Sequence, residues 1–295
     1  MMTLPSFLAA VLAAVPLSVT WVPSGLPSLA EQGPTLCPGP YLTPEQGQEV
    51  LVEARRQFSD AATWTAYATE ARAQVQAGAG LNPFPRRTPL DPIVRARRTF
   101  DGYSVENIAF ESIPGYFVCG NLYRPTEIRA PFPVILSTHG HSRPLVTEAD
   151  LVQQGRFTPW MQTRCATLAR MGAMVLSIEM VGYGESADQF GQGSHAKPFS
   201  VTLQTWNAIR ALDLLLALDG ADRTRVAVSG ESGGGTQTIL LTALDPRVTF
   251  SAPVVMVSSY FFGGCPCESG LPIHRSADHF ANNVLIAALA APRPP

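Results

Sequence analysis

A serine flanked by glycines, at a junction between a strand-like and a helix-like segment, constrains the fold of this chain more than any other feature. The pentapeptide Gly230-Glu231-Ser232-Gly233-Gly234 follows the apolar run 225–229 and precedes the largely apolar stretch 235–241. A serine in such a turn needs glycine neighbours, because a β-carbon beside it would collide with the strand or the helix. The pattern predicts a nucleophile elbow, with Ser232 as the nucleophile and Gly233 as a backbone donor to the oxyanion. The alternative is a plain glycine-rich turn.

Short apolar runs alternate with helical segments around this turn. The expected strands are 132–137, 173–178, 226–229 and 248–257, and the expected helices between the first three are 159–171 and 201–218. Before them, residues 99–123 alternate apolar and polar residues as antiparallel strands do. The order predicts an α/β fold with a doubly wound, mostly parallel sheet, in which the elbow lies at the edge where the strands end.

The N-terminal part has a different character. Apolar residues recur at roughly helical spacing from Pro44 to about Ala77, and four prolines between Asn82 and Pro92 predict an extended linker. Residues 7–15 are apolar and residues 28–30 are small, as in a secretory signal peptide, although no Lys or Arg precedes them. We expect a signal peptide at 1–30, a helical extension and linker at 31–92, and the main domain at 93–295.

This interpretation makes the protein secreted or periplasmic, without membrane attachment in its mature form. A misassigned start or a membrane tether are the alternatives for the first residues. The net charge of −2 and the single lysine, Lys197, give no basic surface for nucleic acid, which we do not expect as a partner.

The turn after the strand at 132–137 carries the second oxyanion donor that such a site needs. Its sequence is Thr138-His139-Gly140-His141, and the main-chain N–H of His141 is the expected donor. His139 is interpreted as a brace for this loop, with a role as catalytic base as the alternative. Glu179, at the end of another strand, is expected to hold loop amides and to be structural.

These residues together resemble a known family. The chain from about 88 to 293 is similar to bacterial acetylxylan-esterase-like α/β-hydrolases, which act on carbohydrate esters. The resemblance is carried by the elbow and by RTFDGY at 98–103, GNLYRP at 120–125, HGH at 139–141, MVGYG at 180–184 and GGCPCESG at 263–270. It implies an α/β-hydrolase fold and serine esterase activity on an acetylated carbohydrate or a small ester, with no cofactor.

The end of the chain departs from the family pattern. A triad in this fold runs in the order Ser, acid, His, and no loop of the usual base-bearing kind is recognisable in 259–295. We therefore expect a C-terminally truncated hydrolase domain that hydrolyses esters feebly or not at all, because an unassisted serine is a poor nucleophile. A base drawn from an unusual place is the alternative. Glu268 is the candidate triad acid, or else an ordinary loop carboxylate.

Two other functions compete with the esterase interpretation. Cys265, Cys267, His274 and His279 offer ligands that zinc accepts, although ordinary thiols or a disulfide are a simpler explanation of the Cys-x-Cys loop. A non-catalytic carbohydrate binder would instead stack sugars on aromatic side chains. The candidates for that role are Trp160, Tyr183, Phe261 and Phe262.

The remaining cysteines fit the interior of a globular domain. The total of five is odd, so at least one stays unpaired within the monomer. Cys119 and Cys165 fall in an expected strand and an expected helix, where they are small buried hydrophobic residues.

Overall fold

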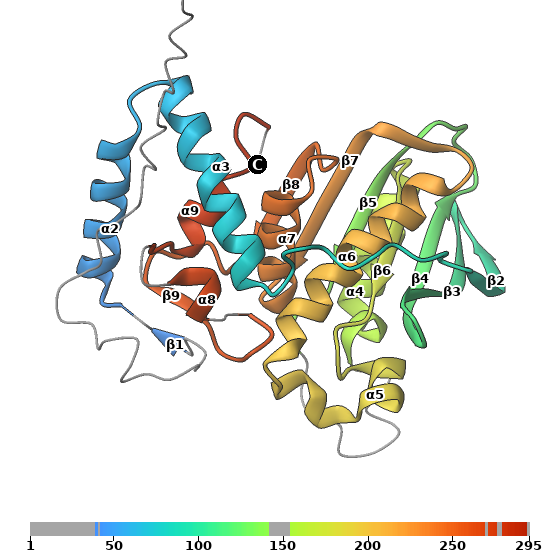
Figure 1. Cartoon of the computed structure of the whole chain (residues 1–295). Helices are drawn as coiled ribbons and strands as arrows, with labels where there is room; N and C mark the ends of the chain where they lie inside the picture. Colours follow the sequence, from blue (N-terminus) through green and yellow to red (C-terminus); the bar gives the residue numbers. More distant parts are fainter. Residues whose placement is uncertain (1–38, 41, 142–153, 269–270, 276–278, 294–295) are drawn as a thin grey trace, which may run out of the picture.

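A seven-stranded mixed sheet forms the centre of the molecule, as the computed structural model in Figure 1 shows. The structure describes residues 39–40, 42–141, 154–268, 271–275 and 279–293, so the predicted signal peptide at 1–30 lies outside the described residues. The strands are β2 (Ile93–Phe100), β3 (Tyr103–Ile113), β4 (Tyr116–Pro125), β5 (Phe132–Thr138), β6 (Met174–Ile178), β7 (Ala221–Glu231) and β8 (Phe250–Val254). Their order in the sheet is β2-β3-β4-β6-β5-β7-β8.

The pairing of these strands confirms both parts of the sequence prediction. Strands β2, β3 and β4 are antiparallel neighbours, and β4 also runs antiparallel to β6. Strands β6, β5, β7 and β8 are parallel. Strand β8 is shorter than the predicted 248–257, and it ends at Val254 because Val255 and Met256 adopt positive φ angles of 64° and 55°, outside the β region.

Helices cover both faces of the sheet. They are α4 (Pro159–Arg170), α5 (Gly184–Phe190), α6 (Phe199–Ala217) and α7 (Gly233–Leu244). Along β5, Val134 and Leu136 pack in one core with α6 and α7, whereas Ile135 between them packs with α4. Since successive strand residues point to opposite faces, α4 covers the face opposite α6 and α7. This is the doubly wound arrangement that the sequence predicts.

Two capped helices precede the sheet. Helix α2 (Pro44–Gln57) begins at a capping box of Thr43 with Gln46, and α3 (Ala61–Gly78) begins at one of Asp60 with Thr63. Such reciprocal bonds satisfy the free N–H groups of a first helical turn. Among the described helices, none combines the length and the apolar character needed to cross a lipid bilayer.

The N-terminal helices pack against the end of the chain. Figure 1 places α2 and α3 beside β9 (Phe261–Gly263), α8 (Leu271–His274) and α9 (Asn283–Ala288), next to the β8 end of the sheet. The short strand β1 (Gly39–Pro40) pairs with β9. A second core joins these segments and contains Leu42, Val50, Ala54, Phe262, Phe280 and Leu285. The extension therefore packs on β9, α8 and α9, a contact that the sequence patterns do not predict.

We predict that Phe262→Ala weakens the packing of the N-terminal helices on β9, α8 and α9 and destabilises the protein. The Phe262 ring is fully buried, so its removal leaves a cavity, and we expect a loss of about 3–5 kcal/mol in the free energy of unfolding. The control is Val52→Ala on α2, where the side chain is 44% exposed and the expected change is about 0.5 kcal/mol or less. The free energy of unfolding of each variant and of the unchanged protein is measured by urea denaturation. Equal midpoints would contradict the packing role of Phe262.

Candidate active site

Ser232 lies in the turn between β7 and α7, as its sequence context predicts. Its backbone has φ 53° and ψ −120°, which is uncommon for a residue with a side chain and marks stored strain. The Ser232 N–H donates to the carbonyl of Val254 at 3.1 Å, which ties the turn to the end of β8. The residue is only partly buried. This is the geometry of a nucleophile elbow.

The glycines beside Ser232 are required by the close approach of β5. A β-carbon at Gly234 would lie 2.5 Å from the Thr138 carbonyl oxygen and 2.7 Å from that of His139. A β-carbon at Gly230 would lie 2.1 Å from the Thr138 hydroxyl. No side chain fits at such distances. The elbow therefore rests directly on the loop that carries His139 and His141.

His139 holds this loop in place. It is fully buried, and its Nε2 accepts the N–H of Met180 at 3.0 Å. Its Nδ1 therefore carries the hydrogen and donates to the Gly140 carbonyl at 2.8 Å. Glu179, also buried, forms an ion pair with Arg156 at 2.9 Å. The geometry agrees with structural roles for His139 and Glu179, although Glu179 contacts the side chains of His139 and Arg156, whereas loop amides were its expected partners.

The side chains of Ser232, His141 and Glu268 meet in a triangle. His141 Nδ1 lies 3.1 Å from Ser232 Oγ and 3.2 Å from Glu268 Oε1. The Ser232 hydroxyl also donates to the same Glu268 oxygen at 3.1 Å. A catalytic relay instead places the serine and the acid on different nitrogens of the imidazole. Here both partners compete for one nitrogen.

Glu268 is held in its charged form. Its burial by itself raises the pKa of the carboxyl, but hydrogen bonds from His141 and from the Gly264 N–H hold that pKa below its ordinary value. The Gly264 bond, at 2.6 Å, reaches the second carboxylate oxygen. The carboxylate therefore stays ionised at neutral pH, oriented toward Ser232 and His141.

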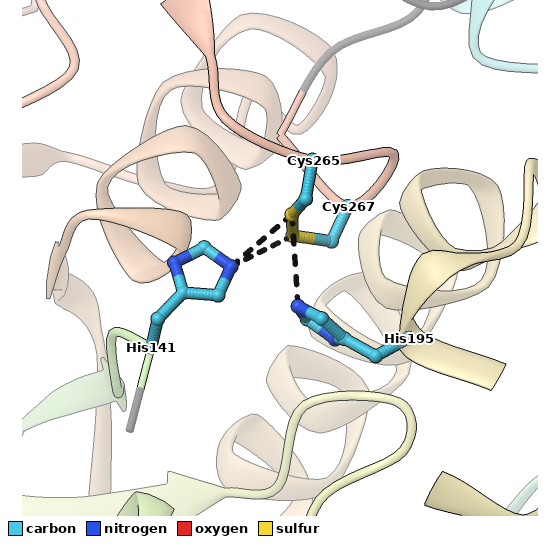
Figure 2. Close-up of side chains that lie close together, drawn as sticks. All are labelled: His141, His195, Cys265 and Cys267. Carbon is cyan, nitrogen blue, oxygen red and sulfur yellow. Dashed lines mark hydrogen bonds between the residues drawn. A yellow bond between two sulfur atoms is a disulfide. The ribbon is translucent and has the colours of Figure 1, made fainter. Parts of the chain in front are cut away.

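Sulfur atoms lie on the other side of His141, as Figure 2 shows. Cys265 and Cys267 form a disulfide, and His141 Nε2 is 3.2 Å and 3.0 Å from their sulfurs. His195, in the short 3-10 helix η3 (Gln192–Ala196), places its Nε2 3.7 Å from Cys265 Sγ. Burial lowers the pKa of His195 to about 4, so this ring is neutral at neutral pH.

The zinc ligands proposed from the sequence do not all come together. Among the described residues, Cys265 and Cys267 gather with His141 and His195. His274 is buried elsewhere, stacked on Phe262 and bonded to Asn283. His279 is also buried, with its Nε2 3.4 Å from the Ile273 carbonyl. The pattern Cys265, Cys267, His274, His279 is thus wrong in its two histidines.

The aromatic platform suggested by the sequence is also not formed as a unit. Phe262 is fully buried and cannot stack on a ligand, and Phe261 packs partly against the main core. Trp160 on α4 is 45% exposed. Tyr183 lies edge-on to His195 with 4.8 Å between the ring centres, so it is the member of the set beside the site.

Comparison with known proteins identifies the family. The sequence matches the acetyl xylan esterase (AXE1) family model over residues 91–261. The chain belongs to this family. It is 37% identical to the methylesterase BT1017, with a TM-score of 0.75 over 86% of this chain and 56% of that one. This member of the acetyl xylan esterase family thus spans little more than half the length of that relative. A comparison with curated proteins gives no match.

More distant structures share the fold. A glucuronoyl esterase from Solibacter usitatus is 18% identical, with a TM-score of 0.54 over 80% of this chain and 74% of that one. A candidate acetyl xylan esterase from Bacteroides fragilis is 16% identical, with a TM-score of 0.58 over 86% and 68%. Together with the observed sheet, these likenesses confirm the α/β-hydrolase fold.

Two side chains of this site are not apparent from the sequence. The side chain of His141 faces Ser232, whereas the motif around it suggested only a main-chain donor. The available signal is that His141, the second His of the HGH motif, is already expected at the site as a main-chain donor. His195 lies outside any recognised motif, and no sequence signal connects it with Cys265.

We predict that Gly234→Ala destabilises the elbow. The added β-carbon would overlap two carbonyl oxygens of the β5 loop, so we expect a loss of about 1–3 kcal/mol in the free energy of unfolding. Gly193→Ala is the matched control, because a β-carbon there meets no atom within 4 Å. Thermal unfolding followed by circular dichroism measures both. A Gly234→Ala variant as stable as the Gly193→Ala variant would refute the close approach.

Proposed function

We propose that this chain is a serine ester hydrolase that removes small acyl groups, such as acetyl, from esterified carbohydrate. The observation that carries the proposal is the position of the Ser232 hydroxyl. It stands on a strained, partly exposed turn, within 3.1 Å of both an imidazole nitrogen and an ionised carboxylate. Membership of the acetyl xylan esterase family supports ester chemistry and a carbohydrate substrate.

The reaction follows from the groups around Ser232. His141 Nδ1 accepts the Ser232 proton while the oxygen attacks the ester carbonyl, and the Glu268 carboxylate stabilises the imidazolium that forms. The N–H groups of Gly233 and His141 bind the resulting oxyanion, with help from the positive end of α7. The proton then passes to the leaving alcohol. Water, activated by the same imidazole, releases the acid from Ser232.

The triangle limits how fast this reaction runs. Nδ1 serves as a base only when the ring hydrogen is on Nε2, because one nitrogen cannot both donate to Glu268 and accept from Ser232. The disulfide favours the active tautomer, since its sulfurs have no hydrogen to donate and accept one from Nε2. We therefore infer Ser232-dependent turnover slower than that of an enzyme with a linear relay.

A methyl ester of a carbohydrate acid is a second candidate substrate. The observation that favours it is the 37% identity to the methylesterase BT1017 over 86% of this chain. The chemistry at Ser232 is the same, but the sugar then lies on the acyl side of the ester and methanol leaves. Acetate release from acetylated xylan, compared with methanol release from a methyl-esterified polyuronate, distinguishes the two.

We predict that Ser232→Ala abolishes ester hydrolysis. Loss of the nucleophile from a serine site reduces kcat on the order of a thousandfold to a millionfold, and the slow wild-type rate sets the measurable range. Hydrolysis of p-nitrophenyl acetate by the full chain is the assay. Equal rates in the two proteins would overturn the proposal. Binding of xylan without Ser232-dependent turnover would instead identify the chain as a non-catalytic carbohydrate binder.

A second prediction tests whether His141 or Glu268 is the general base that accepts the Ser232 proton. His141→Ala should lower kcat about 100- to 10,000-fold, the range of general-base catalysis, and added imidazole should restore part of the rate. Glu268→Gln should lower kcat less, because it keeps the base and removes only the negative charge beside Nδ1. The measurement is kcat with and without imidazole for each variant. The reverse order, without rescue, would assign the base to Glu268.

A further inference from the structure

Four metal-ligating side chains converge beside the proposed nucleophile, from segments far apart in the sequence. His141 follows β5, His195 lies in η3, and Cys265 and Cys267 follow β9. One ligand atom from each lies within 4.8 Å of the other three. Figure 2 shows both imidazoles directed at the two sulfurs. Two sulfurs and two imidazoles are the donor set of tetrahedral structural zinc sites.

Both histidines are also oriented as zinc ligands are. Nδ1 of His195 is 2.8 Å from the Val181 carbonyl, which can only accept, so Nδ1 carries the hydrogen and the Nε2 lone pair faces Cys265. On His141 the far nitrogen contacts the Glu268 carboxylate at 3.2 Å. Zinc-bound histidines usually donate their second N–H to a carbonyl or a carboxylate in this way. The outer partners of a zinc site are thus in place.

We propose that reduction of the Cys265–Cys267 disulfide converts this cluster into a Zn²⁺ site with two thiolate and two imidazole ligands. A phosphine or thiol reductant supplies two electrons, the S–S bond breaks, and each sulfur takes up a proton. Zn²⁺ then binds both sulfurs and releases those two protons.

The ligand atoms are already near the spacing that the ion needs, although they are not yet at it. Zinc bond lengths of about 2.0–2.3 Å place ligand atoms about 3.3–3.8 Å apart in a tetrahedron. The His141 nitrogen is 3.0 Å and 3.2 Å from the sulfurs, and the His195 nitrogen is 3.7 Å from Cys265. Once the S–S bond is broken, the two sulfurs have to move apart from each other and slightly away from His141 to complete the site. The soft sulfur donors favour Zn²⁺ over Mg²⁺ or Ca²⁺.

Zinc at this position acts on the proposed catalytic base. An ion on Nε2 of His141 keeps the hydrogen on Nδ1, so this nitrogen donates to Glu268 and no longer accepts the proton of Ser232. Zinc in the reduced protein then inhibits ester hydrolysis. This consequence rests on the proposed function, whereas the metal site itself does not.

Metal binding is tested first, without reference to activity. The full chain is reduced with a phosphine under argon and titrated with Co²⁺ alone. We expect the thiolate-to-cobalt charge-transfer band and the intense visible bands of tetrahedral cobalt, both removed by Zn²⁺, with a single equivalent bound per chain. The oxidised chain should give neither. Absence of the thiolate band in the reduced chain would overturn the proposal.

Variants identify the ligands. Cys265→Ser with Cys267→Ser should abolish the thiolate band, and His195→Asn should weaken Co²⁺ binding at least about tenfold, as loss of a zinc-site partner does. Cys119→Ser, which changes a thiol outside the cluster, is the matched control and should leave binding unchanged. Circular dichroism verifies folding. Binding that survives His195→Asn but is lost in His279→Asn would assign the site to the tail and overturn the proposal.

Activity is measured last on the same samples. Zinc should inhibit hydrolysis of p-nitrophenyl acetate by the reduced chain, a chelator should reverse it, and the double cysteine variant should be insensitive. Zinc binding without inhibition would contradict His141 as the base and leave the metal site standing. Lack of any Ser232-dependent hydrolysis would contradict the proposed function, while the cobalt spectrum still decides the metal site.

Discussion

The close contact between the elbow and the end of β5 determines the geometry of the whole site. Strands β5 and β7 are parallel neighbours, with Thr138 opposite Gly230, so both chains leave the sheet at the same level. Each then turns across the sheet edge, and the glycines let the two backbones touch. Because protein interiors are close-packed, this contact restricts the position of Ser232 relative to the loop that carries His141. Residues with side chains at Gly230 and Gly234 would push the two loops apart.

A second layer of interactions supports the β5 loop from behind. Buried His139 bonds to Gly140 and to the backbone of Met180, and its Nε2 also contacts the Glu179 carboxylate, which pairs with Arg156. Buried polar groups of this kind are costly unless each has a partner, so a network with its partners in place keeps one arrangement of the loop. The loop therefore presents His141 in a defined position, with one nitrogen toward Ser232 and the other toward sulfur.

The fold was largely predictable from the sequence, and the reasons are local. Alternation of strand-like and helix-like segments, and the glycine pattern at 230–234, depend on neighbouring residues that any single sequence displays. The short elements β9, α8 and α9 were missed, because segments of three to six residues carry little periodicity. The second core was missed for another reason. Phe262 joins residues of α2 more than two hundred positions earlier in the chain.

The side-chain contacts of the site depend on such long-range placement. Ser232, Glu268 and the oxyanion loop were identified by motif, yet no motif shows that Ser232 and Glu268 contact the same nitrogen of His141. The zinc ligands illustrate the limit most clearly. The sequence suggests Cys265 and Cys267 as candidate ligands together with His274 and His279, whereas the structure places His141 and His195 beside them. A motif search selects residues that are close in sequence. The folded sheet brings together residues that are far apart in sequence, and these contacts are not visible in the spacing.

His141 lies between the Glu268 carboxylate and the Cys265–Cys267 disulfide, and these two partners favour different tautomers of its ring. One imidazole hydrogen has two possible locations, and the partner on each side favours one of them. An anionic carboxylate attracts the hydrogen to Nδ1, whereas a disulfide, able only to accept, attracts it to Nε2. The charged partner is the stronger acceptor, so the hydrogen favours Nδ1, and in the proposed mechanism this tautomer slows turnover. A change in the chemistry of the two sulfurs, such as reduction or metal binding, therefore alters whether the Nδ1 that faces Ser232 carries the hydrogen.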